Sequence, residues 1–171
     1  AGRYARLAAT FELRPDVSGD FVRNGVGARL HWEGAAGALD WQRVELRVAG
    51  RRAWTPRAFA GATLVAAARG DAGALVADAP PRQQLFELGN EQNLFGYAYK
   101  EFAGDRAAVA RGTLMLLSPW WRAPLRVGRA FVLPGIEPGV SIGLQGGWAD
   151  ASNAAARAAV ARLDPSPRRV P

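Results

Sequence analysis

The sequence of 171 residues has no cysteine and a single histidine, His31. Without cysteine, a disulfide framework and a thiolate-bound metal are excluded, because both need the sulfur atom. One histidine speaks against a histidine-based catalytic triad and against a zinc site built on imidazoles. Long apolar runs are lacking too: no uninterrupted stretch approaches the roughly 18–20 residues of a transmembrane helix. A membrane could be crossed only by tilted strands of about 9–11 residues.

Lysine is almost absent, since Lys100 is the only one among 22 basic residues. The formal net charge is +7 and the pI is near 11.1. The arginines are spread along the chain, often at alternate positions of strand-like runs, whereas a nucleic-acid binder gathers its basic residues on one face or element. We therefore predict arginines that face solvent or a wet lumen, and no nucleic-acid partner. Because the chain begins at Ala1 without Met or a signal segment, we interpret it as a fragment or a processed product.

Apolar residues make up 49% of the chain, which is too many for a disordered protein, and the length suits one domain. Apolar and polar residues alternate at period two, the period of a β-strand. The alternation predicts strands at residues 4–14, 25–33, 43–48, 57–69, 107–117, 125–133 and 139–148. The single domain is divided into strands (1–69), a long loop (70–104), strands (105–149) and a loop or short helix (150–171). Ser152 or Asn153 is expected to cap a helix from Ala154 to Leu163.

Alternation is shared by soluble sandwiches and membrane barrels, and three further features favour the membrane. The polar faces pair arginine with glutamate at alternate positions, as in Arg43, Glu45 and Arg47, which suits a wet barrel lumen. Connections alternate between short and long, as in outer-membrane barrels. Aromatic residues gather near the expected strand ends, as in interfacial girdles: Tyr4, Trp32, Trp41, Trp54, Trp120, Trp121 and Trp148.

The segment from Leu85 to Arg106 carries the most informative motif. Gly89 is followed by the run Leu94-Phe95-Gly96-Tyr97 and then by Gly104-Asp105-Arg106. In this order the residues resemble the bacterial surface antigen family, the BamA/TamA-like outer-membrane assembly superfamily. Its members carry a Gly-rich lead-in, a motif such as Leu-Arg-Gly-Tyr, and a Gly-Asp pair that opens the next strand. The resemblance covers about Leu85 to Trp148.

The resemblance implies an all-β, antiparallel fold: a partial transmembrane β-barrel of roughly seven to eight strands, incomplete at both ends. It also implies one long loop folded toward the lumen. The loop-docking motif would consist of Gly89, Leu94, Phe95, Gly96, Tyr97, Gly104, Asp105 and Arg106. Within it we expect Gly96 to allow close approach or a positive φ, Tyr97 to offer a flat contact, and Asp105 to cap the re-entry into the strand.

The implied location is the bacterial outer membrane, and the implied function is insertion or translocation of proteins or lipids. The implied partners are the lipid bilayer, client outer-membrane proteins and periplasmic modules of the same chain. One residue departs from the family pattern: Phe95 stands where members commonly have an arginine that pairs with an acidic group on the barrel wall. Either the loop docks by apolar packing, or Arg106 or Lys100 supplies polar contacts, and transport activity is in question.

Two other classes of function stay open at this stage. A soluble β-barrel or sandwich that binds an apolar ligand would show the same alternation, although the alanine-rich run from Ala58 to Ala66 is poor in the large residues that such a core needs. An enzyme is not expected, because Glu87, Glu91, Glu101 and Asp105 have no nucleophile–base pair or metal-ligand spacing beside them. Glu137, between Ile136 and Pro138, is expected in a turn. No cofactor and no metal are predicted, and the sequence does not indicate the client.

Overall fold

The computed structural model of the protein describes residues 3–18, 24–89, 102–119, 123–128, 131–135 and 137–161. Most of them belong to antiparallel β-strands, so the prediction of an all-β fold is confirmed. The motif residues Leu94, Phe95, Gly96 and Tyr97 lie outside the described residues, as does Lys100. Among the described residues, no helix has the length and apolar character needed to cross a membrane.

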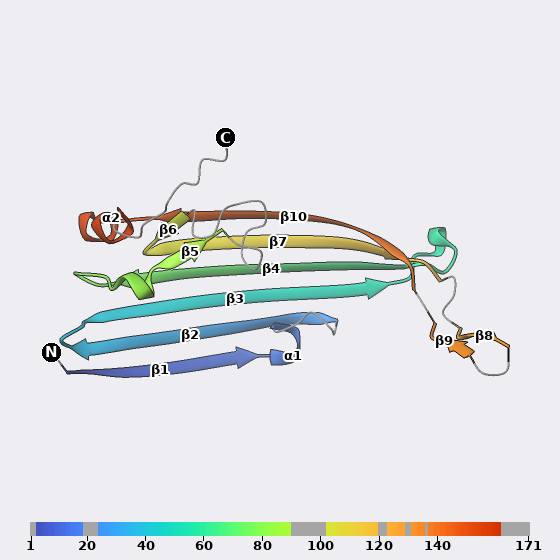
Figure 1. Ribbon diagram of the computed structural model, residues 1–171, viewed down its shortest axis with the longest axis horizontal. Helices are drawn as coiled ribbons and strands as arrows, with labels where there is room; N and C mark the ends of the chain where they lie inside the picture. The colour runs from blue at the N-terminus through green and yellow to red at the C-terminus, as the bar shows by residue number, and fades with distance from the viewer. Residues whose placement is uncertain are drawn as a thin grey trace.

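Six long strands form one sheet in the order β1-β2-β3-β4-β7-β10, with every neighbouring pair antiparallel (Figure 1). These strands are β1 (Tyr4–Leu13), β2 (Gly25–Gly37), β3 (Trp41–Trp54), β4 (Thr63–Val76), β7 (Arg106–Leu117) and β10 (Gly139–Asp150). Two small hairpins are β5 (Phe86–Leu88) with β6 (Phe102–Gly104), and β8 (Leu125–Val127) with β9 (Phe131–Leu133). The helical segments are α1 (Pro15–Ser18), η1 (Arg57–Phe59), η2 (Arg82–Gln84) and α2 (Ala154–Ala161).

The register of the strands sorts their side chains onto two faces, because successive residues of a strand point to opposite sides. For example, Phe11 lies opposite Leu30 and Leu30 opposite Leu46, whereas Arg29 lies opposite Arg47. The apolar face carries Leu7, Phe11, Leu13, Val26, Leu30, Trp32, Val44, Leu46, Val48, Leu64, Leu114, Leu116, Val140, Ile142, Leu144 and Trp148. The charged face carries Arg6, Thr10, Glu12, Arg29, His31, Glu33, Arg43, Glu45, Arg47, Arg69, Asp71 and Arg111.

Strand β4 differs from the expectation in both of its bounds. The strand begins later than predicted, at Thr63, because residues 57–59 form a short 3-10 helix. It also ends later, at Val76, so residues 70–76 are in the sheet where a loop was predicted. Gly70, Asp71 and Gly73 look like turn residues in the sequence. Within the sheet, however, Asp71 pairs with two arginines, and Gly73 lies under the ring of Phe86. These contacts between distant segments override the local signal.

The connection from β7 to β10 also differs from the expected single strand at 125–133. Strand β7 does end at Leu117, just before Ser118-Pro119, as predicted. After it, β8 and β9 form a hairpin, and Gly128 between them has φ +69°, a turn conformation that favours glycine. Long connections therefore occur at both ends of the sheet, and the expected alternation of short and long loops is not strict (Figure 1).

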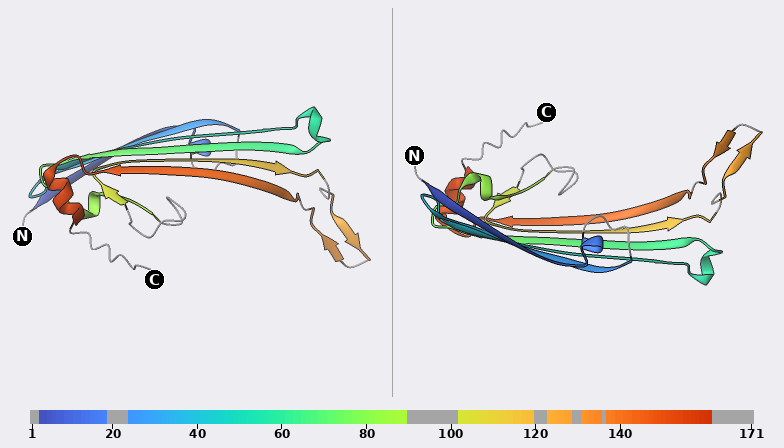
Figure 2. Two further views of the ribbon diagram at one scale, coloured as in Figure 1. Left: turned by 90° about the horizontal axis from the view of Figure 1, so that it is seen from above. Right: turned by 90° about the horizontal axis from the view of Figure 1, so that it is seen from below.

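The β5–β6 hairpin and α2 lie against the charged face, at the end of the sheet where the chain begins, and β8–β9 bends toward the same side at the other end (Figure 2). We call the β5–β6 hairpin and α2 together the cap. A hydrophobic cluster joins the cap to the sheet: Ala35, Trp41, Leu75, Leu85 and Ala159. Trp41 is 3% exposed, so its assignment to an interfacial girdle is wrong; it lies on the charged face and packs under this cap. The helix begins at Ala154 as predicted, with the Asn153 side chain accepting a hydrogen bond from the Ala156 N–H at 2.8 Å.

Candidate functional site

None of the described residues outside the sheet covers its apolar face. Large side chains on it are strongly exposed in every strand, among them Leu7 (66%), Leu46 (44%), Val76 (72%) and Leu144 (79%). Where β4, β7 and β10 lie side by side, small residues at the middle of the strands form a shallow trough of about 540 Å³, lined by Ala72, Ala108, Ala110, Gly146 and Trp148, among others. Large apolar side chains on both flanks and small ones between them give this face an uneven relief.

Charged and amide side chains on the apolar face of the six described strands occur only near the strand ends. Gln42, Arg106 and Asp150 lie toward the capped end, and Arg52 lies toward the other. Trp148 and Trp54, which are 55% and 38% exposed, also lie near opposite ends. The apolar band is therefore bounded at both ends by polar or aromatic side chains, which is the arrangement that a lipid-facing strand requires.

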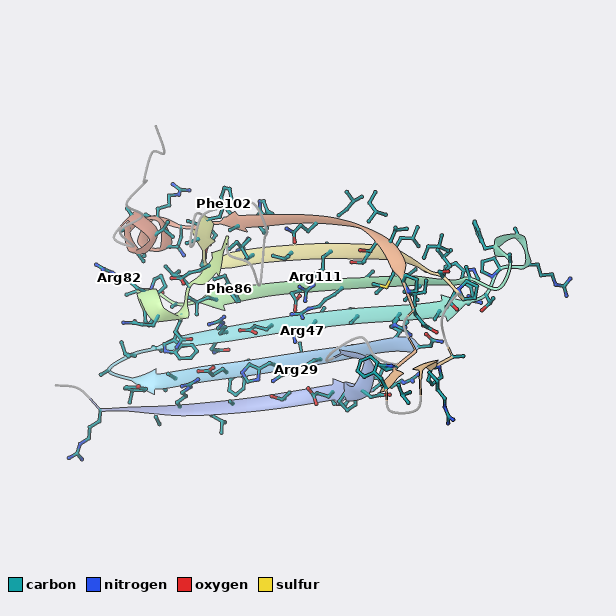
Figure 3. The ribbon with its side chains drawn as sticks, turned by 45° about the vertical axis from the view of Figure 1, so that its right-hand side comes forward. Arg29, Arg47, Arg82, Phe86, Phe102 and Arg111 are labelled. Atoms are coloured by element: carbon teal, nitrogen blue, oxygen red, sulfur yellow. The ribbon has the colours of Figure 1, made fainter. Side chains whose placement is uncertain are left out.

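The charged face holds an arginine groove, which we define by Arg29, Arg43, Arg47, Arg69 and Arg111, contributed by β2, β3, β4 and β7 (Figure 3). Its volume is about 390 Å³. Arg29 lies opposite Arg47 and Arg69 lies opposite Arg111, so that like charges are neighbours in the sheet. Three carboxylates, of Glu45, Asp71 and Glu87, line the same groove, fewer than the five arginines.

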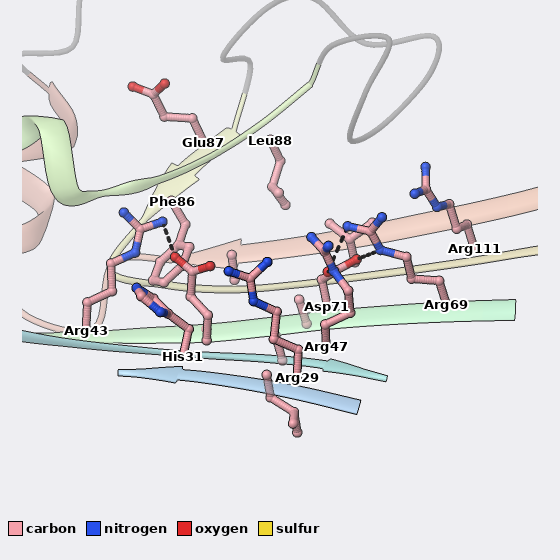
Figure 4. Close-up of a pocket in the computed structure, with 17 residues that line it drawn as sticks. Arg29, His31, Arg43, Arg47, Arg69, Asp71, Phe86, Glu87, Leu88 and Arg111 are labelled. Atoms are coloured by element: carbon pink, nitrogen blue, oxygen red, sulfur yellow. Dashed lines mark hydrogen bonds and ion pairs between the residues drawn. The ribbon is translucent and has the colours of Figure 1, made fainter. Parts of the chain in front are cut away.

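Asp71 holds two of these arginines in place. Arg47 donates from Nε to Asp71 Oδ1 at 2.6 Å, and Arg69 donates from Nε to Oδ2 at 2.6 Å and from Nη2 to Oδ1 at 2.9 Å (Figure 4). These charge-assisted hydrogen bonds fix the orientation of both guanidinium groups. Toward β1, the ion pairs continue with Arg29 and Glu12, whose Nε and Oε1 are 3.4 Å apart, and with Arg6 and the buried Glu33.

One wall of the groove comes from the β5–β6 hairpin. The Phe86 ring lies over Gly73, so close that a Cβ atom at residue 73 would be 2.3 Å from the ring. The Arg43 guanidinium carbon lies 4.3 Å from the centroid of the same ring, a cation–π contact. Arg43 also donates to Glu45 at 2.7 Å. With Leu88 beside Phe86, the groove combines an apolar wall with a basic floor (Figure 4).

Of the predicted motif, the structure describes Gly89, Gly104, Asp105 and Arg106. Gly104 packs on the backbone of β10: a Cβ atom there would be 2.1 Å from the Asp150 carbonyl oxygen. Asp105 is buried, and its carboxylate accepts hydrogen bonds from the Ser152 N–H at 2.8 Å and from the Ser152 hydroxyl. Asp105 therefore fixes the segment between β10 and α2, rather than capping the start of β7 as expected. This pair forms a connection between the β5–β6 hairpin, β7 and α2.

The other two motif residues lie apart from this connection. Gly89 follows β5 and has φ +105°, a conformation that few other residues adopt. Arg106 is exposed on the apolar face, opposite Asp150 in the register, so it lies across the sheet from the arginine groove.

Sequence reasoning missed the arginine groove, although it noted arginines at alternate strand positions. The missing information is the register, since only the pairing of four strands brings Arg29, Arg47 and Arg111 to one place. For chemistry at this site, the described residues include no group of three or more histidine or carboxylate side chains that could hold a metal ion. Comparisons with family models, with curated proteins and with solved structures find no match to this chain.

Proposed function

We propose that this chain forms part of the wall of a transmembrane β-barrel in the bacterial outer membrane. The apolar face would contact lipid, and the charged face would line a water-filled interior. The observation that carries the proposal is the exposed apolar face with polar residues confined to its two ends. In a soluble monomer, contiguous apolar patches rarely exceed a few hundred Å².

The dimensions of the apolar face agree with this proposal. Its extent along a strand, as from Leu7 to Leu13 in β1, is on the order of 20 Å at about 3.4 Å per residue. Six strands about 4.8 Å apart give a width near 25 Å, so the face covers on the order of 500 Å². This area lies toward the upper end of the roughly 300–600 Å² of the largest apolar patch on a typical soluble monomer. Outer-membrane barrels expose an apolar band about 25 Å tall between aromatic girdles. The height of the face and the tryptophans near its ends fit such a band.

The unpaired outer edges of β1 and β10 support a barrel that is completed by further strands. In the described residues each of these strands pairs on one side only. Open edges cannot be placed in hydrocarbon, because their N–H and C=O groups would lack hydrogen-bond partners. The chain would therefore act as a partial barrel within a complete one, as the resemblance to the surface antigen family implies.

Within this class, we propose a role in inserting or translocating proteins or lipids. The support is the ordered motif resemblance together with the close packing of Gly104 and Asp105, the motif's Gly-Asp pair. The cap formed by β5, β6 and α2 would lie in the barrel interior, and residues 90–101, which contain Phe95, connect β5 to β6. Such a role needs no covalent chemistry; the partners would be the bilayer, client outer-membrane proteins and periplasmic modules.

The test is insertion into lipid of the complete protein, in which further strands close the barrel around this chain. The complete protein is refolded with vesicles of outer-membrane lipids, and its resistance to extraction by alkaline carbonate is measured together with heat-modifiable migration in gels. We expect a carbonate-resistant β-sheet form whose migration changes on boiling. A monodisperse chain that unfolds cooperatively in detergent-free buffer would overturn the proposal.

That second outcome would favour the alternative function, a soluble β-barrel or sandwich that binds an apolar ligand. The observation in its favour is the apolar trough of about 540 Å³ beside Trp148. Titration with a fatty acid, followed by tryptophan fluorescence in detergent-free buffer, distinguishes the two. Saturable binding by a soluble monomer would support the alternative, and aggregation without lipid would support the barrel.

A further inference from the structure

We propose that the arginine groove is a binding site for a phosphate group carried by a small amphiphilic molecule. The site lies on the face opposite to the one on which the membrane assignment depends. It therefore goes beyond the proposed function, although that function would place it in the barrel interior. The proposal depends on three features of the groove: the excess of arginines, the orientation of their donors, and the apolar wall.

The excess of positive charge is local and costly. Arginines that neighbour one another across strands, such as Arg29 with Arg47 and Arg69 with Arg111, repel each other. Asp71 relieves part of this repulsion by binding Arg47 and Arg69 together, and Glu12 pairs with Arg29 from β1. With Glu12 counted, the five arginines still face only four carboxylates. A ligand with negative charge would reduce the remaining repulsion among these arginines.

The orientation of the donors favours an oxyanion. A guanidinium group has five N–H donors in a plane, a geometry that matches the oxygens of phosphate and carboxylate groups. The bonds to Asp71 engage one N–H of Arg47 and two of Arg69, so these bonds leave other N–H groups of both side chains for a further acceptor. Several donors from different strands suit phosphate, which has more acceptor oxygens than a carboxylate.

The apolar wall indicates that the ligand is more than the free anion. Phe86, Leu88 and Val109 border the groove, and Phe86 contacts both Gly73 and the Arg43 guanidinium. The volume of about 390 Å³ exceeds what one phosphate needs and falls in the range of small-molecule sites. The geometry points to a phosphate monoester or a lipid phosphate with a short apolar part against Phe86.

Octyl phosphate and inorganic phosphate are the probes, titrated by calorimetry at about 0.1 M salt, where long-range attraction is screened. The titration is run in maltoside micelles or in detergent-free buffer, whichever medium gives the chain its cooperative β-sheet unfolding. Binding to the groove can therefore be measured whether or not the protein inserts into membranes. A third arm offers phosphatidic acid in maltoside micelles, to distinguish a lipid headgroup from a soluble phosphate ester. We expect saturable binding of octyl phosphate, about tenfold tighter than inorganic phosphate.

Substitutions test whether octyl phosphate binds in the arginine groove. Arg47→Gln should weaken octyl phosphate binding about tenfold. Arg126→Gln, which removes the same charge from the β8–β9 hairpin at the other end of the sheet, should leave binding unchanged. Asp71→Asn should strengthen binding severalfold, because it removes the carboxylate that competes for Arg47 and Arg69. A structural role of Asp71 alone would give weaker binding instead. Absence of saturable binding, equal loss in the Arg47 and Arg126 variants, or weaker binding by Asp71→Asn would each overturn the proposal.

Discussion

Gly104 and Asp105 stabilise the same junction in different ways. Gly104 lets the backbone of β6 approach Asp150 in β10, and Asp105 supplies acceptors for the N–H and hydroxyl groups of Ser152. The first effect is steric and the second is electrostatic, so single substitutions separate them. Both residues belong to the motif on which the family resemblance depends, and the structure gives each a role in holding the cap on the sheet.

Gly104→Ala should destabilise the fold by about 1–3 kcal/mol, the usual cost of overpacking. The added Cβ atom would be 2.1 Å from a backbone oxygen, which cannot move without shifting β10. Gly146→Ala is the matched control, since a Cβ atom at residue 146 meets nothing within 4 Å. Urea unfolding followed by tryptophan fluorescence measures both variants. Equal stabilities for the two would contradict the close approach.

Asp105→Asn should cost about 1–3 kcal/mol, because a buried carboxylate that accepts two hydrogen bonds is replaced by a neutral amide. Asp78→Asn, at an exposed position in the connection after β4, should change the free energy of unfolding by less than about 0.5 kcal/mol. The same unfolding assay applies. An unchanged free energy of unfolding for Asp105→Asn would show that this residue does not stabilise the junction.

Among the elements, the contact between β4 and β5 explains why the sequence misplaced the end of β4. Gly73 has no side chain, so the ring of Phe86 in β5 can approach the strand closely, and we expect this packing to help keep residues 70–76 in the sheet. If so, Gly73→Ala should lower the free energy of unfolding by about 1–3 kcal/mol when Phe86 is present and by much less in the Phe86→Ala background. A double-mutant cycle with Gly73→Ala and Phe86→Ala measures the difference. Additive effects would show that the contact is not what orders this part of β4.

The elements that the sequence predicted well are those that a local pattern specifies. Strands β1, β2, β7 and β10 follow from alternation of period two, and α2 follows from its Asn153 cap and alanine content. The elements and contacts that it did not predict depend on distant partners. Trp41 was assigned to the membrane interface, yet it packs under α2 beside Leu75, a contact visible only once the cap is in place. The arginine groove likewise depends on strand register, which local sequence does not specify.

At the scale of the whole molecule, the two faces of the sheet need opposite surroundings, polar for the charged face and apolar for the other. The charged face is partly covered by the cap and is rich in ion pairs, whereas the apolar face has no protein against it in the described residues. A lipid environment satisfies both, since water inside a barrel solvates one face and hydrocarbon contacts the other. The cost of placing a charge on the apolar face should therefore depend on its depth in the bilayer.

This depth dependence gives the sharpest test of the membrane assignment. Leu46 lies near the centre of the apolar face of β3, and Gln42 lies near the end of the same face of the same strand. In lipid vesicles, Leu46→Arg should destabilise the complete barrel by about 2–4 kcal/mol and Gln42→Arg by about 0–1 kcal/mol, because arginine at the midplane loses hydration that it keeps at the interface. Urea unfolding of the vesicle-bound complete protein measures the effect of both substitutions. A soluble protein would behave differently: Leu46 is 44% exposed, so arginine there would remain in water, and both substitutions would be nearly neutral.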